Sequence, residues 1–484
     1  MKEKIIAIDQ GTSSTRAVLY DTKGRLLDAA QEEFQQFFPQ EGWVEHNPEL
    51  IWESVLSTLT TLTKKNNLTS SDIASIGITN QRETTIVWNR KTGKPISNAI
   101  VWQDRRTAEF CNSLSGEEKS VQEKTGLTLD PYFSATKLHW LLNNIEGAKE
   151  LAINGDLLFG TVDTYLIWKL TEGRSFKTDV TNASRTMLFN IEEQEWDEDL
   201  LNLFQVPKKM LPEVCDNVHN FGFTSILGGE ITIGGVAGDQ QAALIGQCCF
   251  DPGEVKSTFG TGCFMIVNTG DHILTSENKL LSTIGYRING ETTYALEGSI
   301  FVAGSAVQWL RDGLNFFKDS SETESLAKDA SPDSNVLVVP ALTGLGAPYW
   351  DAEARGAIFG LTRDTNIADI TRATLESIIF LSRDLLEAMK KDNANFNSLM
   401  VDGGMVVNNW FCQQLSNILE VQVLRPKIIE TTSLGAGYLA GLHAGVFENI
   451  DSLKTYKQID ETFNPLKESN RYKEWKRAVE KVLT

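Results

Sequence analysis

The sequence predicts an α/β protein built from two similar domains that face one cleft. Strands and helices alternate along the first half, a strand–turn–strand unit opens the chain at residues 5–19, and a similar unit recurs at residues 255–267. Such alternation is typical of layered α/β domains. Because a chain of 484 residues is too long for one core, we expect two large domains, residues 1–250 and 251–484.

The hairpin that opens the chain carries the groups of a phosphate site at its turn. An apolar strand ends at Asp9, and Gly11 is followed by the hydroxyl run Thr12–Thr15 and by Arg16. Amides and hydroxyls in a concave turn bind phosphate oxygens, and a guanidinium adds a fixed positive charge. Asp9 suits a Mg²⁺ ion, held directly or through water. The hairpin indicates ATP chemistry without a Walker A lysine, with a polar surface turn as the alternative.

Helix and strand signals follow the hairpin. Asn47, Pro48 and Glu49 are typical of an N-cap, a first helical position and an acidic first turn. We therefore expect a helix through Leu50–Thr63. Residues Ile73–Thr79 form an apolar run that predicts the next strand.

A basic and an acidic residue lie just after that strand. Arg82 and Glu83 are near its carboxyl end, where α/β folds bind ligands. One supplies donors and the other acceptors, which suits neighbouring hydroxyls of a polyol. Trp102 and Tyr132 are candidates for an apolar wall and one more hydroxyl. A surface ion pair with two core aromatics is the alternative, and spacing alone favours that alternative.

The Gly238–Gln241 stretch opens a helix that we expect near Asp239–Phe250. An acid at a helix start is a cap in most proteins. Asp239, however, lies just before the expected hinge, where a carboxylate can orient a substrate hydroxyl and accept its proton. Both interpretations, a cap and a catalytic base, remain open from the sequence pattern.

The second half repeats the hairpin and adds glycine-rich turns. The later hairpin has Gly-Thr at residues 260–261, as the first has at residues 11–12. Leu399–Gly404 reads as a strand and a Gly-Gly turn before a helix, where backbone can approach a flat ligand or a phosphate. A tight turn is the alternative. Gly304 and Gln308, at the start of another helix, are candidates for completing a nucleotide pocket.

Three further segments indicate structure rather than chemistry. We expect a long amphipathic helix over Asn366–Met389 and a solvated polar connection over Asp319–Asn335. Gly435–Ala440 matches a loose dinucleotide-binding pattern, but it follows a polar run and not a strand. Close packing of a small-residue helix explains it better.

The net charge and the use of cysteine argue against several classes of protein. The formal charge is 45 − 64 = −19, which repels nucleic acids and anionic membranes, so neither is an expected partner. The six cysteines and five histidines are scattered without disulfide or metal-ligand spacing. No apolar run has membrane-spanning length, and the first residues lack a signal-peptide pattern. We expect a cytoplasmic protein with reduced thiols and no membrane insertion.

Six motifs occur along the chain in an order that is typical of one protein family. They are Asp9–Thr12, Asn80–Thr84, Asp130–Ser134, Gly238–Gln241, Gly260–Phe264 and Gly344–Asp351. Together they resemble the glycerol kinases, a branch of the carbohydrate kinase family in the actin and heat-shock ATPase superfamily. The similarity runs from Ile5 to about Gly445. The opening hairpin marks only the superfamily, whereas Asp-Pro-Tyr-Phe-Ser and Ala-Pro-Tyr-Trp-Asp are much more specific. The resemblance implies two actin-like (ribonuclease H-like) domains facing a central cleft.

The resemblance also implies a reaction and a role for each site residue. The reaction would phosphorylate glycerol with ATP and Mg²⁺, giving sn-glycerol 3-phosphate and ADP, with Asp239 as base. The implied glycerol-binding residues are Arg82, Glu83, Tyr132, Asp239 and Gln240, with Trp102 and Phe264 facing the carbon skeleton. The residues implied to contact the transferring phosphates are Thr12, Ser13, Ser14 and Arg16, with Asp9 at Mg²⁺. Those implied to hold the nucleotide from the second domain are Thr261, Gly304, Gln308, Gly404 and Asn408.

One segment departs from the family pattern. Relatives inhibited by fructose 1,6-bisphosphate carry Gly-Gly-x-Arg shortly before the Gly-Asp-Gln-Gln stretch. This chain has Gly228–Ile231 there, with Glu230 in place of the arginine, and an acid would repel that ligand. Thr224–Ile233 also lacks the histidine that other relatives phosphorylate. The family further implies a homodimer or homotetramer, whose interface no stretch identifies.

Two other functions remain compatible with these observations. The same fold acts on other polyols or on ketoses such as xylulose, and a substrate panel would separate these from glycerol. An ATP-driven binding protein, chaperone-like or filament-forming, would use ATP without an acceptor. A chaperone would need a peptide-binding domain, and none is apparent after residue 445.

Overall fold

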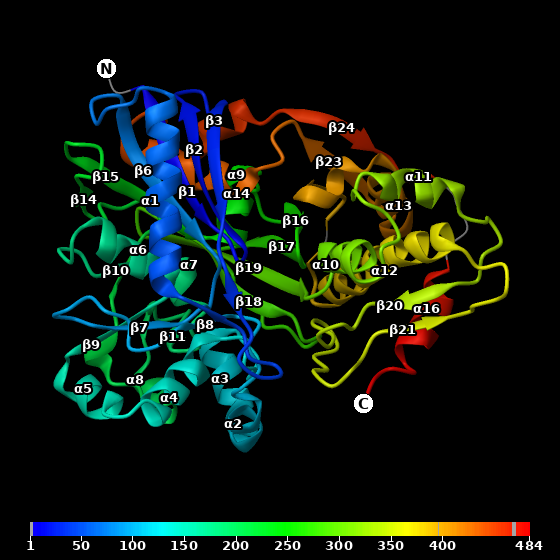
Figure 1. Ribbon diagram of the computed structural model, residues 1–484, viewed down its shortest axis with the longest axis horizontal. Coiled ribbons are helices and arrows are strands. Elements are labelled where there is room, and N and C mark those ends of the chain that lie inside the picture. Colours follow the sequence, from blue (N-terminus) through cyan, green and yellow to red (C-terminus); the bar gives the residue numbers. More distant parts are fainter. Residues whose placement is uncertain (1–2, 395, 467–470) are drawn as a thin grey trace.

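Two mixed sheets and the helices between and around them form the framework of the molecule (Figure 1). The structure, a computed structural model, describes residues 3–394, 396–466 and 471–484. In order across the first sheet, the strands are β14 (Phe223–Thr224), β15 (Ile231–Gly238), β6 (Ile73–Asn80), β1 (Lys4–Gln10), β2 (Ser14–Asp21) and β3 (Leu26–Glu33). Across the second they are β18 (Leu281–Ile288), β19 (Glu291–Ile300), β17 (Cys263–Gly270), β16 (Val255–Phe259), β22 (Ser398–Asp402), β23 (Gln422–Pro426) and β24 (Ile459–Phe463).

Shorter strands form small sheets beside these two. They are β4 (Gln36–Phe37), β5 (Glu45–His46) and β8 (Ala99–Ile100); β7 (Ile86–Asn89) and β9 (Leu157–Gly160); β10 (Lys177–Asp179) and β13 (Glu213–Cys215); β11 (Phe189–Asn190) and β12 (Glu195–Trp196); and β20 (Leu337–Val339) and β21 (Ala357–Phe359).

The helices divide between the two halves of the chain. In the first half they are α1 (Pro48–Lys65), α2 (Ala108–Ser113), α3 (Glu118–Thr125), α4 (Ser134–Asn144), α5 (Ala148–Asn154), α6 (Val162–Leu170), α7 (Val180–Ala183), α8 (Glu198–Leu203) and α9 (Asp239–Gly246). In the second half they are α10 (Gly304–Gln308), α11 (Glu322–Asp329), α12 (Ile367–Lys391), α13 (Asn409–Leu419), α14 (Thr431–His443), α15 (Ile450–Leu453) and α16 (Tyr472–Val479).

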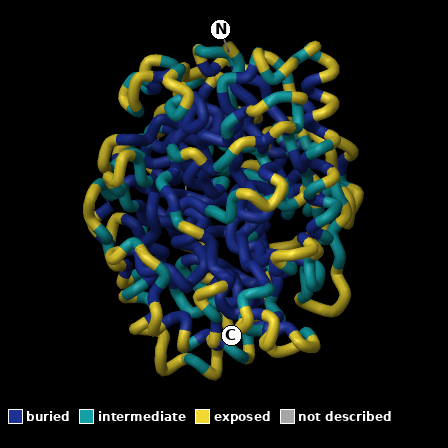
Figure 2. The backbone as a smooth tube through the Cα atoms, turned by 90° about the vertical axis from the view of Figure 1, so that its left-hand side faces the viewer, coloured by how far each residue is buried: buried dark blue, intermediate teal, exposed yellow. Residues whose placement is uncertain are grey.

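The molecule is layered because both faces of each sheet carry apolar side chains, which helices cover. Helices α1 and α6 pack on one face of the first sheet, and α12 and α13 pack on one face of the second. Between the sheets lie α9 and α14, whose apolar residues form a core with residues of both sheets. Buried backbone runs through this interior, while exposed backbone is concentrated in the outer loops (Figure 2). We use "N-lobe" for the first sheet with its helices and "C-lobe" for the second.

Most predicted elements are present. The opening hairpin is formed by β1 and β2, paired antiparallel, and the later one by β16 and β17. Helix α1 begins as its signals indicate, since the Asn47 side chain accepts a hydrogen bond from the backbone N–H of Glu49. The long helix α12 is capped by Asn366. Among the described residues no helix has both the length and the apolar character that a membrane crossing requires.

Two predicted elements differ from the structure. The stretch Asp319–Asn335 contains helix α11, and the prediction of a purely solvated connection is wrong there. This short helix buries Thr323 and Ala327, and most of its other residues are polar or charged, so its composition resembles that of a loop. Helix α9 ends at Gly246, short of Phe250, and Cys248 soon after it has a left-handed backbone (φ 51°).

Helices α9 and α14 approach each other closely enough to require glycine. A Cβ built on Gly435 would lie 1.8 Å from the carbonyl oxygen of Ala242, and one on Gly246 would lie 2.0 Å from that of Thr431. Both neighbours are backbone atoms of the facing helix, so a side chain would force the helices apart. This contact confirms close packing as the reason for the small residues near Gly435.

We expect Gly435→Ala to lower the free energy of unfolding by about 1–3 kcal/mol, the range of overpacked cores. The added methyl group has to displace backbone, and no flexible side chain can yield instead. Urea unfolding followed by circular dichroism measures the change. Gly116→Ala is the control, because a Cβ there meets nothing within 4 Å. Equal midpoints for the two variants would contradict the packing argument.

Candidate active site

Two cavities adjoin each other: residues of both lobes line one of them, and residues of the C-lobe alone line the other. The smaller, which we call the acceptor cavity, has a volume of about 180 Å³, and the larger, the nucleotide cavity, about 530 Å³. Gly260 and Thr261, in the turn between β16 and β17, line both cavities. Ligands bound in the two cavities would therefore meet at this turn.

The register of the first sheet brings the predicted acceptor residues together. Strands β1, β6 and β15 are parallel neighbours, with Gln10 opposite Asn80 and Asn80 opposite Gly238. Their carboxyl ends therefore share one edge, as expected for a ligand site in an α/β fold. All seven residues predicted to bind the acceptor line the smaller cavity: Arg82, Glu83, Trp102, Tyr132, Asp239, Gln240 and Phe264.

Asp239 is the first residue of α9 and lies in the wall of the acceptor cavity. Its carboxylate is 3.2 Å from Nε of Arg82 and accepts a hydrogen bond from the backbone N–H of Gln240. Desolvation in the cleft raises the pKa of Asp239, and the charges of Arg82 and Lys256 oppose that rise. A carboxylate held this way can accept a proton from a hydroxyl in the cavity.

Arg82 and Glu83 belong to a buried network of four charges. Glu297 on β19 accepts hydrogen bonds from both Nη atoms of Arg82, at 2.6 and 2.9 Å, and from Nη2 of Arg185 at 2.9 Å. Arg185 also donates from Nε to Glu83 at 2.7 Å. Although burial opposes ionisation, Arg185 and Arg82 hold the pKa of Glu297 at about 2. Glu83 has a left-handed backbone (φ 60°), a strained conformation of the kind that clusters at functional sites.

Three aromatic rings close the apolar side of the acceptor cavity. Trp102 makes edge contacts with Tyr132 and Phe264, with ring centroids 5.6 and 6.0 Å apart. The indole Nε1 donates to the hydroxyl of Thr12 at 2.9 Å, which ties the wall to the opening hairpin. The combination of ion pairs on one side and rings on the other suits a ligand with hydroxyls on a short carbon skeleton.

The predicted nucleotide residues line the larger cavity: Thr261, Gly304, Gln308, Gly404 and Asn408. Gly404 begins the turn after β22, and Asn408 caps α13 by accepting from the N–H of Phe411 at 2.9 Å. The structure adds residues that the sequence argument missed, among them Arg311, Ser320, Ser321 and Glu324. The last three lie in or just before α11, the helix that the polar composition concealed.

Asp9 fits the divalent cation that its position implies. It lines the acceptor cavity, and no donor in the described part of the chain forms a hydrogen bond to its carboxylate. Burial raises the pKa of Asp9 to about 7, with Arg16 opposing the rise. A carboxylate oxygen that lacks a protein donor is a suitable ligand for Mg²⁺, directly or through water.

The structure does not bring every predicted phosphate contact into the cavities. Thr12 lines the acceptor cavity, but Ser13, Ser14 and Arg16 line neither cavity. Arg16 forms an ion pair with Glu430 instead. The roles of these three residues at the transferring phosphates stay predictions.

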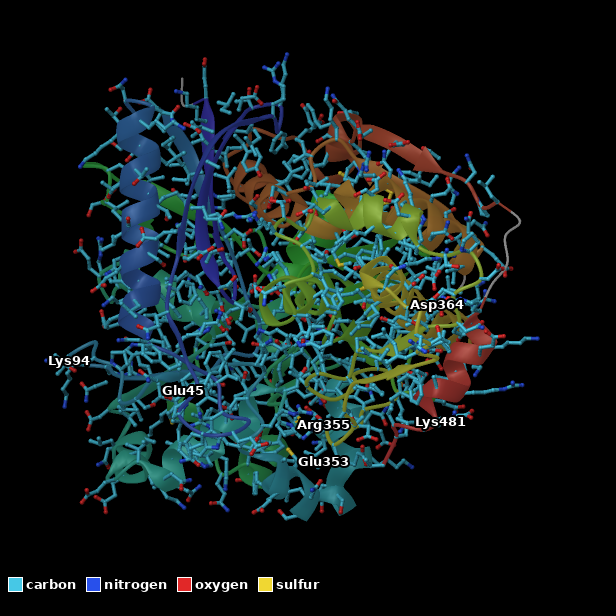
Figure 3. All side chains as sticks on the ribbon, turned by 45° about the vertical axis from the view of Figure 1, so that its right-hand side comes forward. Glu45, Lys94, Glu353, Arg355, Asp364 and Lys481 are labelled. Carbon is cyan, nitrogen blue, oxygen red and sulfur yellow. The ribbon has the colours of Figure 1, made fainter. Side chains whose placement is uncertain are left out.

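Charged side chains in the cleft differ from those elsewhere on the molecule. Lys94, Asp364 and Lys481 are examples of exposed surface charges (Figure 3). By contrast, the buried charges of the cleft include Arg185, Lys256 and Glu297, none of which the sequence argument singled out. Lys256 and Glu297 lie at buried positions of strands whose composition is mixed. Ionic residues are almost never fully buried without a partner, but this composition gave no signal that the two positions are buried.

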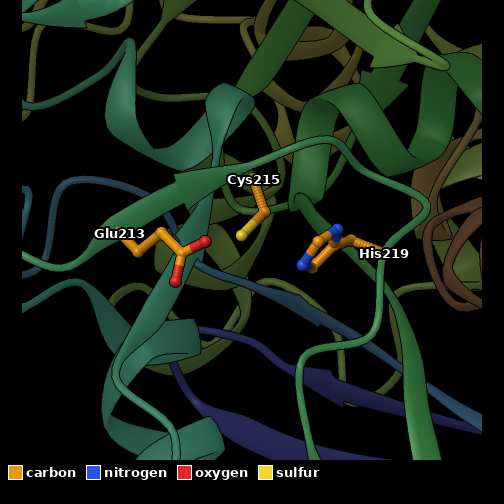
Figure 4. Close-up of side chains that lie close together, drawn as sticks. All are labelled: Glu213, Cys215 and His219. Atoms are coloured by element: carbon orange, nitrogen blue, oxygen red, sulfur yellow. The ribbon is translucent and has the colours of Figure 1, made fainter.

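A second group of side chains, of types that can ligate a metal, lies outside both cavities. Glu213, Cys215 and His219 approach each other closely enough to share a metal ion (Figure 4). However, Lys177 donates from Nζ to Nε2 of His219 at 3.0 Å and lies 4.0 Å from Glu213. This ammonium already supplies the positive charge, so we do not assign a metal here.

Comparisons with known proteins agree with this geometry. The N-terminal domain of the FGGY family of carbohydrate kinases matches residues 4–246, and its C-terminal domain matches residues 255–444. The glycerol kinase of Alteromonas mediterranea is 58% identical over 100% of this chain and 99% of its own length. That of Marinomonas sp. is 56% identical over 100% of both chains.

A solved structure agrees equally well. It is described as Plasmodium falciparum glycerol kinase with ADP, and it superposes with a TM-score of 0.89 at 37% identity, covering 99% of this chain and 98% of its own. The predicted fold, two actin-like α/β domains facing a cleft, is thereby confirmed. The chain belongs to the FGGY family of carbohydrate kinases.

Proposed function

We propose that the protein transfers the terminal phosphoryl group of ATP to a primary hydroxyl of glycerol, forming sn-glycerol 3-phosphate and ADP. The observation that carries this is the junction of the two cavities beside Asp239. The relatives with more than half of their residues identical are glycerol kinases, which supports the same acceptor. We also propose a division into two domains near residue 250.

The size of the acceptor cavity supports a small acceptor. Its volume of about 180 Å³ is below the roughly 300–1,000 Å³ of ordinary ligand pockets. A three-carbon triol needs less room than a pentulose. The ion pairs of Arg82 and Glu83 and the hydroxyl of Tyr132 offer donors and acceptors to its hydroxyls, and Trp102 and Phe264 face its carbon chain.

The chemistry follows from where the groups lie. Asp239 orients the attacking hydroxyl and takes its proton as the new O–P bond forms and the bond to the ADP oxygen breaks. The backbone and hydroxyls of the two Gly-Thr turns hold the phosphates between the lobes. A Mg²⁺ ion held by Asp9 would neutralise phosphate charge. Closure of the lobes would exclude water and limit ATP hydrolysis. We further propose a cytoplasmic homodimer or homotetramer.

A substrate panel tests the proposal. With purified protein, Mg²⁺ and ATP, we expect kcat/KM for glycerol to exceed that for xylulose and for other polyols, measured by coupled detection of ADP. A reaction without acceptor measures ATP hydrolysis, which we expect to be slow. Preference for a pentulose would overturn glycerol as the acceptor, and fast acceptor-independent hydrolysis would favour an ATP-driven binding protein. Fructose 1,6-bisphosphate is added in a further arm, where Glu230 predicts no inhibition.

A further inference from the structure

We propose that Lys256, a buried residue of the C-lobe, is a positioning residue for the acceptor: it fixes the side-chain amide of Gln240 so that the amide NH₂ group faces the bound hydroxyl. This inference rests on the proposed function. It concerns a residue outside the predicted site, and it makes the geometry of the acceptor cavity depend on the other lobe.

The contact itself crosses between the two lobes. Lys256 is the second residue of β16, in the C-lobe sheet, and its side chain is fully buried. Its Nζ donates to Oε1 of Gln240 at 2.5 Å and to the hydroxyl of Thr258 at 2.9 Å. Gln240 is the second residue of α9, on the N-lobe side, directly after Asp239.

The chemistry of an ammonium group determines the orientation of the amide. A lysine ammonium has three donors and no acceptor, so only the amide oxygen of Gln240 can face it. The NH₂ group must then point away from Lys256. The carboxylates of Asp402, Asp239 and Glu297 favour the charged form of Lys256, although burial lowers its pKa.

The NH₂ group of Gln240 is left for a ligand. Gln240 is 4% exposed and lines the acceptor cavity. No acceptor within residues 3–394, 396–466 and 471–484 takes a hydrogen bond from its Nε2. Because Nε2 is not sealed from the cavity, water can pair with it in the free protein, and a ligand hydroxyl can replace that water. The arrangement fits a hydroxyl oxygen of the acceptor as that partner.

Without Lys256, the amide could rotate and present its oxygen instead. That state would lose the donor to the hydroxyl and would leave a carbonyl beside it. In the part of the chain that the structure describes, Lys256 donates hydrogen bonds to Gln240 and Thr258, neither of which lines the nucleotide cavity, so the loss of binding should fall on the acceptor. Because the charge of Lys256 also opposes the raised pKa of Asp239, kcat should change as well, and KM is the readout for the role of Gln240. The expected signature is a higher KM for glycerol with a KM for ATP that changes little.

The test is a double-mutant cycle on KM for glycerol. We expect Lys256→Met and Gln240→Leu each to raise this KM by about ten- to hundredfold, the effect of losing a hydrogen bond in a buried site. In the double variant the KM should match that of Gln240→Leu alone, since Lys256 acts through Gln240. Effects that multiply in the double variant, or an unchanged KM in Lys256→Met, would overturn the inference.

A second variant keeps the test decisive if Lys256→Met fails to fold. Gln240→Glu retains an oxygen facing Lys256, and indeed strengthens that contact, but removes the NH₂ donor. We expect it to fold with an unfolding midpoint at or above that of the wild type and to show a raised KM for glycerol. A normal KM in this variant would show that the NH₂ group does not serve the hydroxyl, and the inference would fall.

Controls separate this inference from the proposed function. Lys476→Met removes another lysine that donates to an aspartate and a hydroxyl, Asp384 and Tyr349, outside both cavities, and it should leave both KM values unchanged. If the wild type does not phosphorylate glycerol, the proposed function fails. If the wild type does so and Lys256→Met keeps its KM, only the role of Lys256 fails.

Discussion

Asp239→Asn is expected to lower kcat for glycerol phosphorylation by about 10²–10⁴-fold, the usual contribution of general acid–base catalysis. Asparagine keeps the volume of the side chain and its place at the start of α9, but it cannot accept the proton of the attacking hydroxyl. Glycerol should still bind, because Arg82 stays paired with Glu297 and the aromatic wall is intact. Steady-state kinetics measures kcat, and calorimetry measures glycerol binding.

The control for this variant is Asp251→Asn. Asp251 is an exposed surface acid paired with Lys454, outside both cavities, so its removal should leave kcat unchanged. A near-normal kcat in Asp239→Asn would show that Asp239 is not the base. A lost kcat together with lost glycerol binding would show instead that Asp239 acts as a binding group.

Local signals predicted only part of the elements of the fold, and most of those predicted are present. Neighbouring residues alone predict the helix start at Asn47–Glu49 and the two Gly-Thr hairpins, and the structure confirms all three. The sequence argument missed helix α11 because its composition is polar and its first residue has no side-chain cap, so the segment resembles a loop. Neighbouring residues cannot report which face a short polar helix turns toward the protein.

The order of the motifs predicted that the acceptor residues lie together, and the register of the first sheet explains how residues far apart in the chain come to share one edge. Arg82 and Asp239 are far apart in the chain, yet they follow parallel strands that are direct neighbours, so both lie at one edge. Spacing alone favoured a surface ion pair for Arg82 and Glu83. The joint occurrence of several strand-end motifs was the stronger signal, because independent turns and caps do not explain it.

The supporting charges could not be predicted in the same way. Arg185, Lys256 and Glu297 reach the site through contacts with residues distant in sequence, at positions without any motif. A charged residue in a buried strand has to have a partner, but tertiary packing determines which residue that partner is. A single sequence therefore does not predict which residues pair with these buried charges.

Glu297→Gln is expected to lower the free energy of unfolding by about 3–5 kcal/mol, the cost of breaking a buried ion pair by removing one partner. The substitution preserves shape but removes the one carboxylate that pairs with both buried guanidiniums, those of Arg82 and Arg185, and leaves them only Glu83 and Asp239. Urea unfolding measures the change. Glu387→Gln is the matched control, because Glu387 pairs with Arg383 at a partly exposed site, where such pairs contribute only about 0–1 kcal/mol.

The double variant Arg185→Met/Glu297→Gln tests why the single change is costly. Removing Arg185 as well removes the second guanidinium that Glu297 paired, while Arg82 keeps its contacts with Glu83 and Asp239. We therefore expect the double variant to be more stable than the sum of the two single effects by about 0.5–3 kcal/mol, the coupling seen between residues in contact. Additive effects would mean that the four charges do not act as one unit. A coupled result would mean that Glu297, from the C-lobe, stabilises the acceptor site by neutralising both N-lobe arginines together, so that the lobes cannot separate at this point without exposing unpaired charge.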